Sequence, residues 1–283
     1  MSAPITGATR LVAVIGSPVR HSLSPALHNA AFRSAGLDWR MVAFDVIAGR
    51  ATEAIEAMKT LGIAGYAVTM PHKADVAVVA DQVDATAKAL GSVNTVALRS
   101  DGSTFGTSTD GDGFVASVDL AGFDLAGARV AVLGAGGAAR SIIEALGRAG
   151  VDDIAVINRT TSNAELAAAL TPVARVGRVD DVADAALLIN TTPIGMGHAA
   201  DDGGGLPIDP TLLRGDLVVA DIVYHPLVTP LLRAAADAGA ATIDGLGMLV
   251  HQAVLQQQLW TGLRPDPMVM RAAAERELAA RSA

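Results

Sequence analysis

Apolar stretches alternate along the chain with alanine-rich stretches of helical periodicity. The apolar stretches are continuous runs, which is typical of strands in a parallel sheet whose two faces are both covered. Strands that alternate with helices predict βαβ units and therefore an α/β fold. We predict strands at 10–15, 39–46, 63–69, 129–133, 153–157, 186–190 and 217–221, and helices at 25–35, 51–61, 138–149 and 164–170.

Two glycine-rich segments interrupt this alternation and indicate domain boundaries. A turn is predicted at 110–113, before a helix, and Gly122 and Gly127 then lead into a new strand. A second break falls at 244–247, before a long helix that contains residues 248–259. The chain therefore has the organisation of two α/β domains. A further glycine-rich stretch, 195–205, is expected to be a mobile loop.

Composition and charge exclude several classes of protein. The chain has 283 residues, 51% of them hydrophobic, which is enough for two globular domains. The formal net charge of −8 argues against a nucleic-acid surface, because phosphate binding needs clustered Lys and Arg. The chain has no cysteine, which excludes disulfides and thiolate chemistry, and its six histidines show no metal-ligand spacing.

The hydropathy of the chain also bears on its location. No segment approaches the apolar length of a membrane span, and the N-terminus lacks the pattern of a signal peptide. We therefore expect a cytoplasmic protein with no metal, membrane or nucleic-acid partner.

A glycine-rich turn follows the predicted strand at 129–133. Residues 134–139 read GAGGAA, which is the G-x-G-x-x-A dinucleotide fingerprint in a strand–turn–helix context. Gly134 permits the tight turn, Gly136 lets a pyrophosphate approach the backbone, and Ala139 allows the helix to pack closely on the strand. The alternative is a glycine-rich turn that serves packing alone.

The end of the next predicted strand bears on the choice of cofactor. An NAD-selective site usually has an acidic residue about 20 residues after the glycines, where it holds the ribose 2′-hydroxyl. Here the strand ends at Ile157 and Asn158-Arg159-Thr160 follow. No carboxylate is present to repel a 2′-phosphate, and Arg159 can pair with one. This favours NADP over NAD, although a solvated arginine in a turn is the alternative.

Ser22 and Ser24 stand beside the start of the predicted helix at 25–35. Two hydroxyls next to backbone amides that already favour an anion make a reasonable carboxylate site. The alternative is capping, because Ser24 followed by Pro25 is a good N-cap with proline at the first helical position. The sequence alone leaves both readings open.

Three further polar residues lie close to predicted strands. Lys73 follows the strand at 63–69, at the carboxyl end where ligands bind in α/β sheets, and its ammonium can donate to a reacting oxygen. Taken alone, Lys73 is also explained as a surface lysine in the first turn of a helix. Asn94 and Asp110 are each explained as a turn or cap residue when taken alone.

Taken together, these segments resemble the shikimate dehydrogenase family. The matching motifs run in order over nearly the whole chain, so their joint signal is strong. They are GSPVxHSxSPxxHN at 16–29, VTMPxK at 68–73, GSVNT at 91–95, TDG at 109–111, GAGGA at 134–138, NRT at 158–160, NTTPxGM at 190–196, YxPxxTPLL at 224–232 and DGLGMLVxQ at 244–252.

The resemblance implies two α/β domains with a cleft between them. Residues 1–110 plus 246–283 are expected to form a discontinuous substrate-binding catalytic domain with a parallel-rich sheet. Residues 111–245 are expected to form a Rossmann-like NADP-binding domain. The implied reaction is the reversible NADPH-dependent reduction of 3-dehydroshikimate to shikimate in chorismate and aromatic amino acid biosynthesis, carried out by a monomer or homodimer on a carboxylated cyclohexene substrate.

The resemblance also assigns site residues. Lys73 and Asp110 are the implied catalytic pair. The implied substrate contacts are Ser22, Ser24, Thr69, Lys73, Asn94, Asp110, Tyr224 and Gln252. The implied cofactor contacts are Gly134, Ala135, Gly136, Gly137, Ala138, Asn158, Arg159, Thr160, Ile222, Gly245 and Met248.

Three positions depart from the family's usual pattern. Ala67 and Ser108 stand where the family usually has asparagine, which leaves open a related enzyme that acts on quinate or another ring hydroxy acid, with NAD. Asn163 stands where a second arginine often follows, which weakens the preference for NADP. A non-enzymatic NADP-binding sensor is an alternative of another class, since fold does not fix function, but the presence of both Lys73 and Asp110 argues against it.

Overall fold

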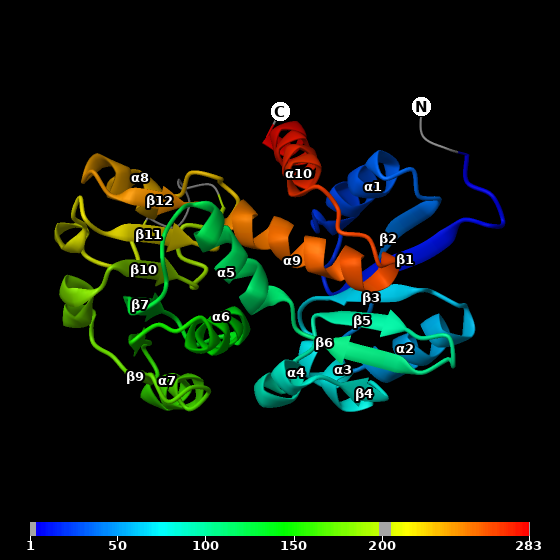
Figure 1. The fold of residues 1–283 in the computed structure, drawn as a ribbon, viewed down its shortest axis with the longest axis horizontal. Coiled ribbons are helices and arrows are strands. Elements are labelled where there is room, and N and C mark those ends of the chain that lie inside the picture. The colour runs from blue at the N-terminus through cyan, green and yellow to red at the C-terminus, as the bar shows by residue number, and fades with distance from the viewer. Residues whose placement is uncertain (1–3, 198–204, 283) are drawn as a thin grey trace. The chain divides into compact units, whose positions relative to one another are not determined.

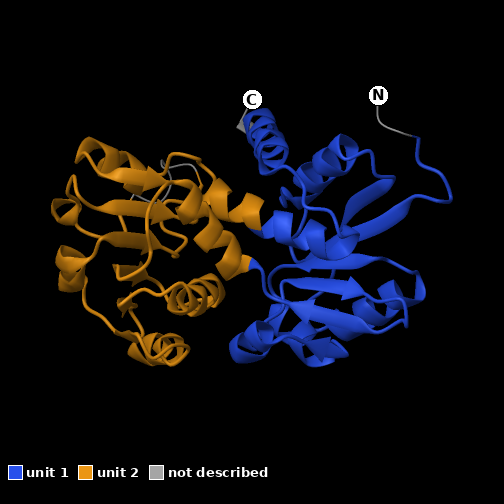
Figure 2. Cartoon of the chain, viewed as in Figure 1, with its two compact units in different colours: residues 1–109, 252–283 blue, residues 110–251 orange. Residues whose placement is uncertain are grey.

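The computed structural model describes residues 4–197 and 205–282 (Figure 1). The chain divides into two compact units, residues 1–109 with 252–283 and residues 110–251 (Figure 2). Each unit is built on a six-stranded sheet with helices, which confirms the predicted α/β class. Most of the loop predicted at 195–205 lies outside the described residues.

The sheet of the first unit, which we call unit 1, is mixed. Its strand order is β2-β1-β3-β5-β6-β4. β1 pairs in parallel with β2 and β3, whereas β5 runs antiparallel to both β3 and β6. The strands are β1 (Arg10–Gly16), β2 (Trp39–Asp45), β3 (Gly65–Val68), β4 (Gln82–Val83), β5 (Thr95–Leu98) and β6 (Thr104–Thr107).

Helices cover both faces of this sheet. They are α1 (Ser24–Ser34), α2 (Ala51–Thr60), α3 (Lys73–Val79), α4 (Ala85–Leu90) and α10 (Pro267–Ser282), together with the second half of α9 (Gly245–Thr261). The end of α9 is seated directly on the sheet, because the Trp260 indole lies against Gly65, where any Cβ would overlap the ring. The Trp260 indole N–H donates to the carbonyl of Val96 at 2.9 Å.

The sheet of the second unit, unit 2, is wholly parallel, with the order β12-β11-β10-β7-β8-β9. The chain runs outward from β7 in one direction and then outward from β10 in the other, which is the doubly wound order of a Rossmann domain. The strands are β7 (Arg129–Leu133), β8 (Asp153–Ile157), β9 (Ala174–Val176), β10 (Leu187–Asn190), β11 (Val218–Asp221) and β12 (Ala241–Ile243).

The helices of unit 2 follow from its apolar pattern. α6 buries Ile142, Ile143 and Leu146 on one face, against the core that β7 and β8 also line. The helical elements are α5 (Asp110–Leu120), α6 (Gly137–Arg148), α7 (Thr161–Ala168), α8 (Pro230–Asp237), the first half of α9, and the 3₁₀ helices η1 (Val179–Asp184) and η2 (Pro210–Leu212).

One predicted element of this unit is wrong and one is shifted along the chain. Residues 110–113, predicted as a turn, are the first turn of α5, because Gly111 lets this helix pack against α6 so closely that a Cβ there would overlap the carbonyl of Ser141. The helix predicted at 164–170 begins three residues earlier, at Thr161, and ends at Ala168.

Candidate functional site

Two loops meet at the carboxyl ends of β1 and β3 in unit 1. The Ser17 N–H donates to the carbonyl of Met70 at 2.9 Å. Gly16 makes this approach possible, because a Cβ at this position would overlap the methyl group of Thr69. The carboxyl ends of strands are where α/β sheets bind ligands, so both predicted loops lie at the appropriate edge of the sheet.

The two predicted carboxylate-binding serines lie at the start of α1. Ser24 is the first helical residue, and Leu23 takes the cap position without a side-chain cap hydrogen bond. The prediction that Ser24 is an N-cap is therefore wrong, because the helix begins one residue earlier than expected. Ser22 Oγ accepts the N–H of Ser24 at 3.2 Å, which places both hydroxyls beside the amino end of the helix. Backbone amides at such an end favour an anion.

Lys73 is the first residue of α3, directly after the loop that follows β3. Its carbonyl accepts the N–H of Val93 at 2.9 Å. Its neighbour His72 is fully buried and its Nε2 lies 2.7 Å from the carbonyl of Val46, so the proton is on Nε2. Lys73 thus lies in the first turn of a helix, as expected for a surface lysine. Its backbone is nevertheless fixed at the edge of the sheet where α/β proteins bind ligands.

Asn94 forms hydrogen bonds to the ends of β3 and β6. It is only 2% exposed, and its Oδ1 accepts the N–H of Thr109 at 2.8 Å and the hydroxyl of Thr95 at 2.7 Å. Its carbonyl accepts the N–H of Val68 at 2.7 Å. Because a backbone N–H can only donate, the contact with Thr109 fixes the orientation of the amide. Asn94 is therefore more than a turn residue, since it sets the end of β6 against the end of β3.

A buried polar cluster that the sequence pattern did not reveal supports Asn94 from α9. His28 is fully buried, with Nε2 at 3.2 Å from Gln256 Oε1, and Gln256 Nε2 donates to the Asn94 carbonyl at 3.4 Å. Burial lowers the pKa of His28 to about 4, so the ring is neutral at pH 7. Gln252 lies one turn before Gln256 on the same helix and is 7% exposed. The only signal for this cluster in the sequence was His28, the second histidine of the motif at 16–29.

In unit 2 the predicted dinucleotide turn lies at the point where the strand order reverses. Gly134 follows β7 with a φ of +107°, and its N–H donates to the carbonyl of Ile157 at 2.9 Å. A Cβ at Gly134 would overlap Thr191 Oγ1, and this hydroxyl donates to the Leu133 carbonyl at 2.6 Å. Only glycine fits both the backbone conformation and the space.

The rest of the turn is open where a phosphate would approach. Gly136 is the N-cap of α6, and a Cβ built on Gly136 or Gly137 would meet nothing within 4 Å. Ala139 is fully buried where the helix packs on the sheet. An exposed helix start with open backbone amides and a tightly packed helix body fits a dinucleotide pyrophosphate.

The end of β8 has the features predicted for a 2′-phosphate site. Arg159 is exposed and forms no ion pair with the described residues. Asn158 Nδ2 donates to the carbonyl of Thr160 at 2.9 Å, and Thr160 precedes α7 without a side-chain cap hydrogen bond. An unpaired guanidinium beside a helix start is an arrangement that favours a phosphate.

The predicted nicotinamide contacts come together after β11. Gly245 opens α9, and a Cβ there would overlap the carbonyl groups of Ile222 and Val223. Met248, one turn further along α9, and Ile222 are both half-buried against the same hydrophobic core. Gly245 thus allows the start of α9 to contact the backbone of the loop that follows β11.

The loop that carries Tyr224 is held by a buried carboxylate that no sequence motif marked. Asp221 ends β11 and accepts hydrogen bonds from Asn190 Nδ2 at 3.0 Å, the Val223 N–H at 3.0 Å and the Thr229 hydroxyl at 2.7 Å. Burial raises the pKa of Asp221. Tyr224 itself is half-buried. The motifs at 190–196 and 224–232 flank this network, but no residue spacing identifies it.

Asp110 belongs to unit 2 and is 8% exposed. It is the first residue of α5, so its carboxylate stands at the amino end of that helix. The contact of Gly111 with Ser141 sets this helix start against α6, the helix of the dinucleotide turn. Asp110 directly follows Thr109, whose N–H is bound by Asn94.

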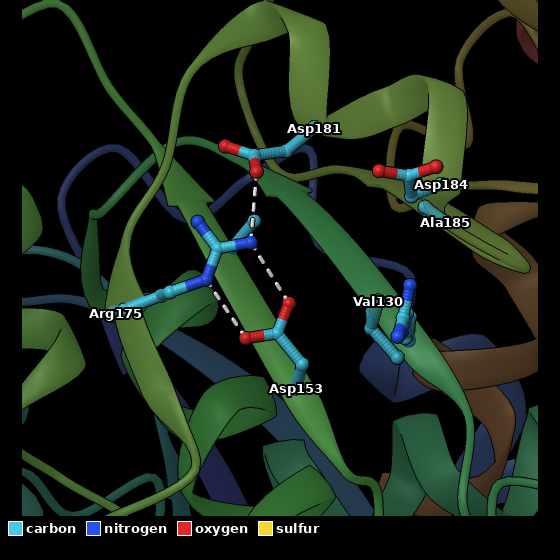
Figure 3. Close-up of a pocket in the computed structure, with 8 residues that line it drawn as sticks. Val130, Asp153, Arg175, Asp181, Asp184 and Ala185 are labelled. Carbon is cyan, nitrogen blue, oxygen red and sulfur yellow. Dashed lines mark hydrogen bonds and ion pairs between the residues drawn. The ribbon is translucent and has the colours of Figure 1, made fainter.

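A pocket of about 310 Å³ lies at the other, amino-terminal ends of β7 and β8 (Figure 3). Arg175 spans it, at 2.8 Å from Asp153 and at 2.8 Å from Asp181. Its guanidinium is thus already paired with two carboxylates, and the strand ends are the wrong ones for an α/β ligand site. We interpret this pocket as part of an ion-pair network.

Two classes of feature are absent from the described part of the chain. No group of three or more histidines and carboxylates could hold a metal ion there. None of the described helices is long and apolar enough to cross a bilayer.

Comparison with known proteins identifies the family. Three sequence profiles match, for the shikimate dehydrogenase substrate binding domain over residues 14–96, for shikimate/quinate 5-dehydrogenase over 116–190 and for the shikimate 5′-dehydrogenase C-terminal domain over 245–275. The NADP⁺ shikimate dehydrogenase of Symbiobacterium thermophilum is 43% identical over 95% of this chain and 94% of its own.

Solved structures agree with these matches. Shikimate 5-dehydrogenase of Thermus thermophilus, in complex with NADP(H) and shikimate, superposes with a TM-score of 0.88 at 36% identity, covering 94% of this chain and 99% of that one. Quinate dehydrogenase of Corynebacterium glutamicum, in complex with NAD, gives 0.86 at 32% identity over 94% and 98%. With matches of this extent over both units, the chain belongs to the shikimate dehydrogenase family.

Proposed function

We propose that the chain is an NADP-dependent shikimate dehydrogenase that reversibly reduces 3-dehydroshikimate to shikimate. The observation that carries the proposal is the buried, hydrogen-bonded Asn94 at the strand ends of unit 1. It occurs in a chain whose unit 2 has an open dinucleotide turn and no acidic residue directly after β8. The first feature suits a polyhydroxylated ring, and the second suits NADP.

Unit 1 is the proposed substrate-binding domain and unit 2 the proposed NADP-binding domain. Ser22 and Ser24 bind the substrate carboxylate, with support from the amino end of α1. The remaining polar side chains bind the ring hydroxyls and the reacting oxygen. They are Thr69, Lys73, Asn94, Asp110, Tyr224 and Gln252.

Lys73 and Asp110 form the proposed acid–base pair. NADPH, when bound, supplies the hydride that the ring ketone accepts. The pair delivers a proton to the substrate oxygen in reduction and removes it in oxidation. An ammonium and a carboxylate together can hold this proton near the reacting oxygen in either direction.

The proposed cofactor site uses the turn after β7 and the loop after β8. The amides at the start of α6 bind the pyrophosphate and Arg159 pairs with the 2′-phosphate. Ile222, Gly245 and Met248 line the nicotinamide. The complete proposed set is Gly134, Ala135, Gly136, Gly137, Ala138, Asn158, Arg159, Thr160, Ile222, Gly245 and Met248.

Steady-state rates on shikimate and on quinate, each with NADP⁺ and with NAD⁺, test the proposal. We expect the highest kcat/KM for shikimate with NADP⁺. A far higher value for quinate with NAD⁺ would replace the proposed substrate and cofactor. Binding of NADPH without turnover of any ring acid would favour the sensor instead.

Quinate is the second candidate because two amides that the family usually carries are missing. Ala67 is 5% exposed on β3 and Ser108 is 4% exposed after β6, so neither position is a surface substitution. A second enzyme of this fold, quinate dehydrogenase, binds NAD. The cytoplasmic location and the monomeric or homodimeric state stay predictions.

A further inference from the structure

We propose that unit 1 carries a second anion-binding site, which takes a compact polyvalent anion such as a phosphate ester or a polycarboxylate. The site is a pocket of about 580 Å³ along α1 and α10. These two helices pack against each other (Figure 1). This volume is ordinary for a small-molecule site. We call it the arginine pocket, and its charged lining consists of Arg20, Arg33, Arg276, Arg281 and Glu277.

The charge of the arginine pocket is opposite to that of the whole chain. Four arginines and one glutamate give its lining a formal charge of +3, in a chain with a net charge of −8. Like charges gathered in one place repel one another, so such a cluster favours the binding of an anion. The guanidinium fork matches phosphate and carboxylate oxygens in pairs, which suits an anion with several acceptor atoms.

Three of the four arginines have no partner within the described chain. The guanidinium groups of Arg20, Arg33 and Arg276 form no hydrogen bond or ion pair with the described residues. The sequence of α10 explains why Arg276 is left unpaired. Arg271 pairs with Glu275 at 2.9 Å at the i, i+4 spacing, but the positions four residues before and after Arg276 are both alanine.

The fourth arginine anchors the pocket to the loop that carries Ser22. Arg281 Nη2 lies 3.0 Å from Glu277 Oε1, and its Nη1 donates to the carbonyl of His21 at 2.6 Å. Arg281 therefore fixes the end of α10 to the segment between Arg20 and Ser22. Ser22 itself lines the pocket, so an anion held there would lie beside the proposed substrate carboxylate site.

Titration with citrate and with inorganic pyrophosphate tests the site, with the intact protein kept saturated with NADP⁺ so that the cofactor's own phosphate site is filled. Binding is measured by calorimetry. We expect saturable one-to-one binding of at least one of the two anions, and selectivity between them identifies the polycarboxylate or the phosphate source. Arg33→Ala and Arg276→Ala should each weaken the affinity about tenfold, as expected for a lost charge-assisted hydrogen bond.

Two further variants distinguish binding in the arginine pocket from binding elsewhere on the protein. Arg233→Ala removes an exposed, unpaired arginine on α8 and should leave anion binding unchanged. Ser24→Ala alters the proposed substrate site and should also leave it unchanged, whatever its effect on the enzyme. The proposal is overturned by an absence of saturable binding, by equal weakening in Arg233→Ala, or by loss of binding in Ser24→Ala. None of these results depends on turnover of shikimate.

Discussion

Asn94 Oδ1 accepts the backbone N–H of Thr109 at 2.8 Å, and Thr109 is the residue before Asp110. A buried amide in unit 1 thereby fixes the chain where unit 2 begins. The side chain of Thr109 adds to this contact, since its Oγ1 accepts a hydrogen bond from Asn94 Nδ2 at 3.1 Å. Asn94 therefore has a structural role beside the substrate contact that we propose for it.

Replacing this amide should lower stability and activity together. Asn94→Ala leaves the Thr109 N–H buried without a partner, which costs about 1–3 kcal/mol in the free energy of unfolding. We expect kcat/KM for shikimate to fall as well, because Asp110 loses its fixed neighbour. Urea denaturation and steady-state kinetics measure the two effects. Asn163→Ala, an exposed asparagine on α7, is the control for stability and should change it by less than about 0.5 kcal/mol.

The acid–base assignment predicts a loss of turnover without a loss of cofactor binding. Lys73→Met and Asp110→Asn should each lower kcat by about 10²–10⁴-fold, the usual contribution of general acid–base catalysis. The Kd of NADPH, measured by fluorescence titration, should stay close to that of the wild type. Lys88→Met, at an exposed lysine on α4, is the matched control. A Lys73 or Asp110 variant with at least half the wild-type kcat would contradict the assignment.

Two glycines of one turn should respond differently to the same substitution. Gly134→Ala places a Cβ against Thr191 Oγ1 at a φ of +107°, so both stability and NADPH binding should fall. Gly136→Ala meets open space in the protein, so stability should be nearly unchanged while NADPH binding weakens. Thermal unfolding with and without NADPH measures both. Equal destabilisation by the two variants would show that the turn serves packing alone.

Arg159 should determine the choice between the two nicotinamide cofactors. Arg159→Ala removes the one charge predicted to pair with the 2′-phosphate, so KM for NADP⁺ should rise about tenfold or more while KM for NAD⁺ changes little. The ratio of kcat/KM for the two cofactors gives the result directly. Arg233→Ala again serves as the control. A parallel rise in both KM values would remove the role assigned to Arg159.

The buried His28 should make the protein less stable in acid. Its pKa is lowered from an ordinary 6.5 to about 4, because burial disfavours the charged ring. Above pH 6.5 the His28 ring is neutral in both the folded and the unfolded chain, so it does not make the free energy of unfolding depend on pH. As the pH falls from 6.5 toward 4, the unfolded chain binds the proton first, so stability declines by up to about 3 kcal/mol.

The measurement is urea denaturation between pH 7 and pH 4. His28→Gln should have a flatter pH dependence than the wild type, whereas His21→Gln, at an exposed histidine, should keep the wild-type slope. Carboxylates also titrate in this range, and the difference between variants isolates the histidine. Identical slopes for wild type and His28→Gln would contradict the prediction.

Many elements of this fold were predictable because they have a local signal, although the helix α10 was not among them. The strands at 129–133 and 153–157 agree with β7 and β8 to the residue, since continuous apolar runs are what a covered parallel sheet requires. β4, β5, β6, β9 and β12 were missed, because strands of two to four residues carry little periodicity. The turn predicted at 110–113 is helical because the packing of Gly111 on α6 outweighs a local turn preference.

The candidate site divides in the same way. Motif chemistry and spacing marked the dinucleotide turn and Arg159, because each depends on neighbours in the chain. The roles of Ser22 and Lys73 came from the family resemblance, since each residue alone had a simpler explanation. The other positioning contacts of the site join residues that are far apart in the sequence. Asn94 meets Thr109, and His28 meets Gln256 across 228 residues, only when the chain is folded. Such contacts have no local signature, so the tertiary structure alone assigned these residues their positioning roles.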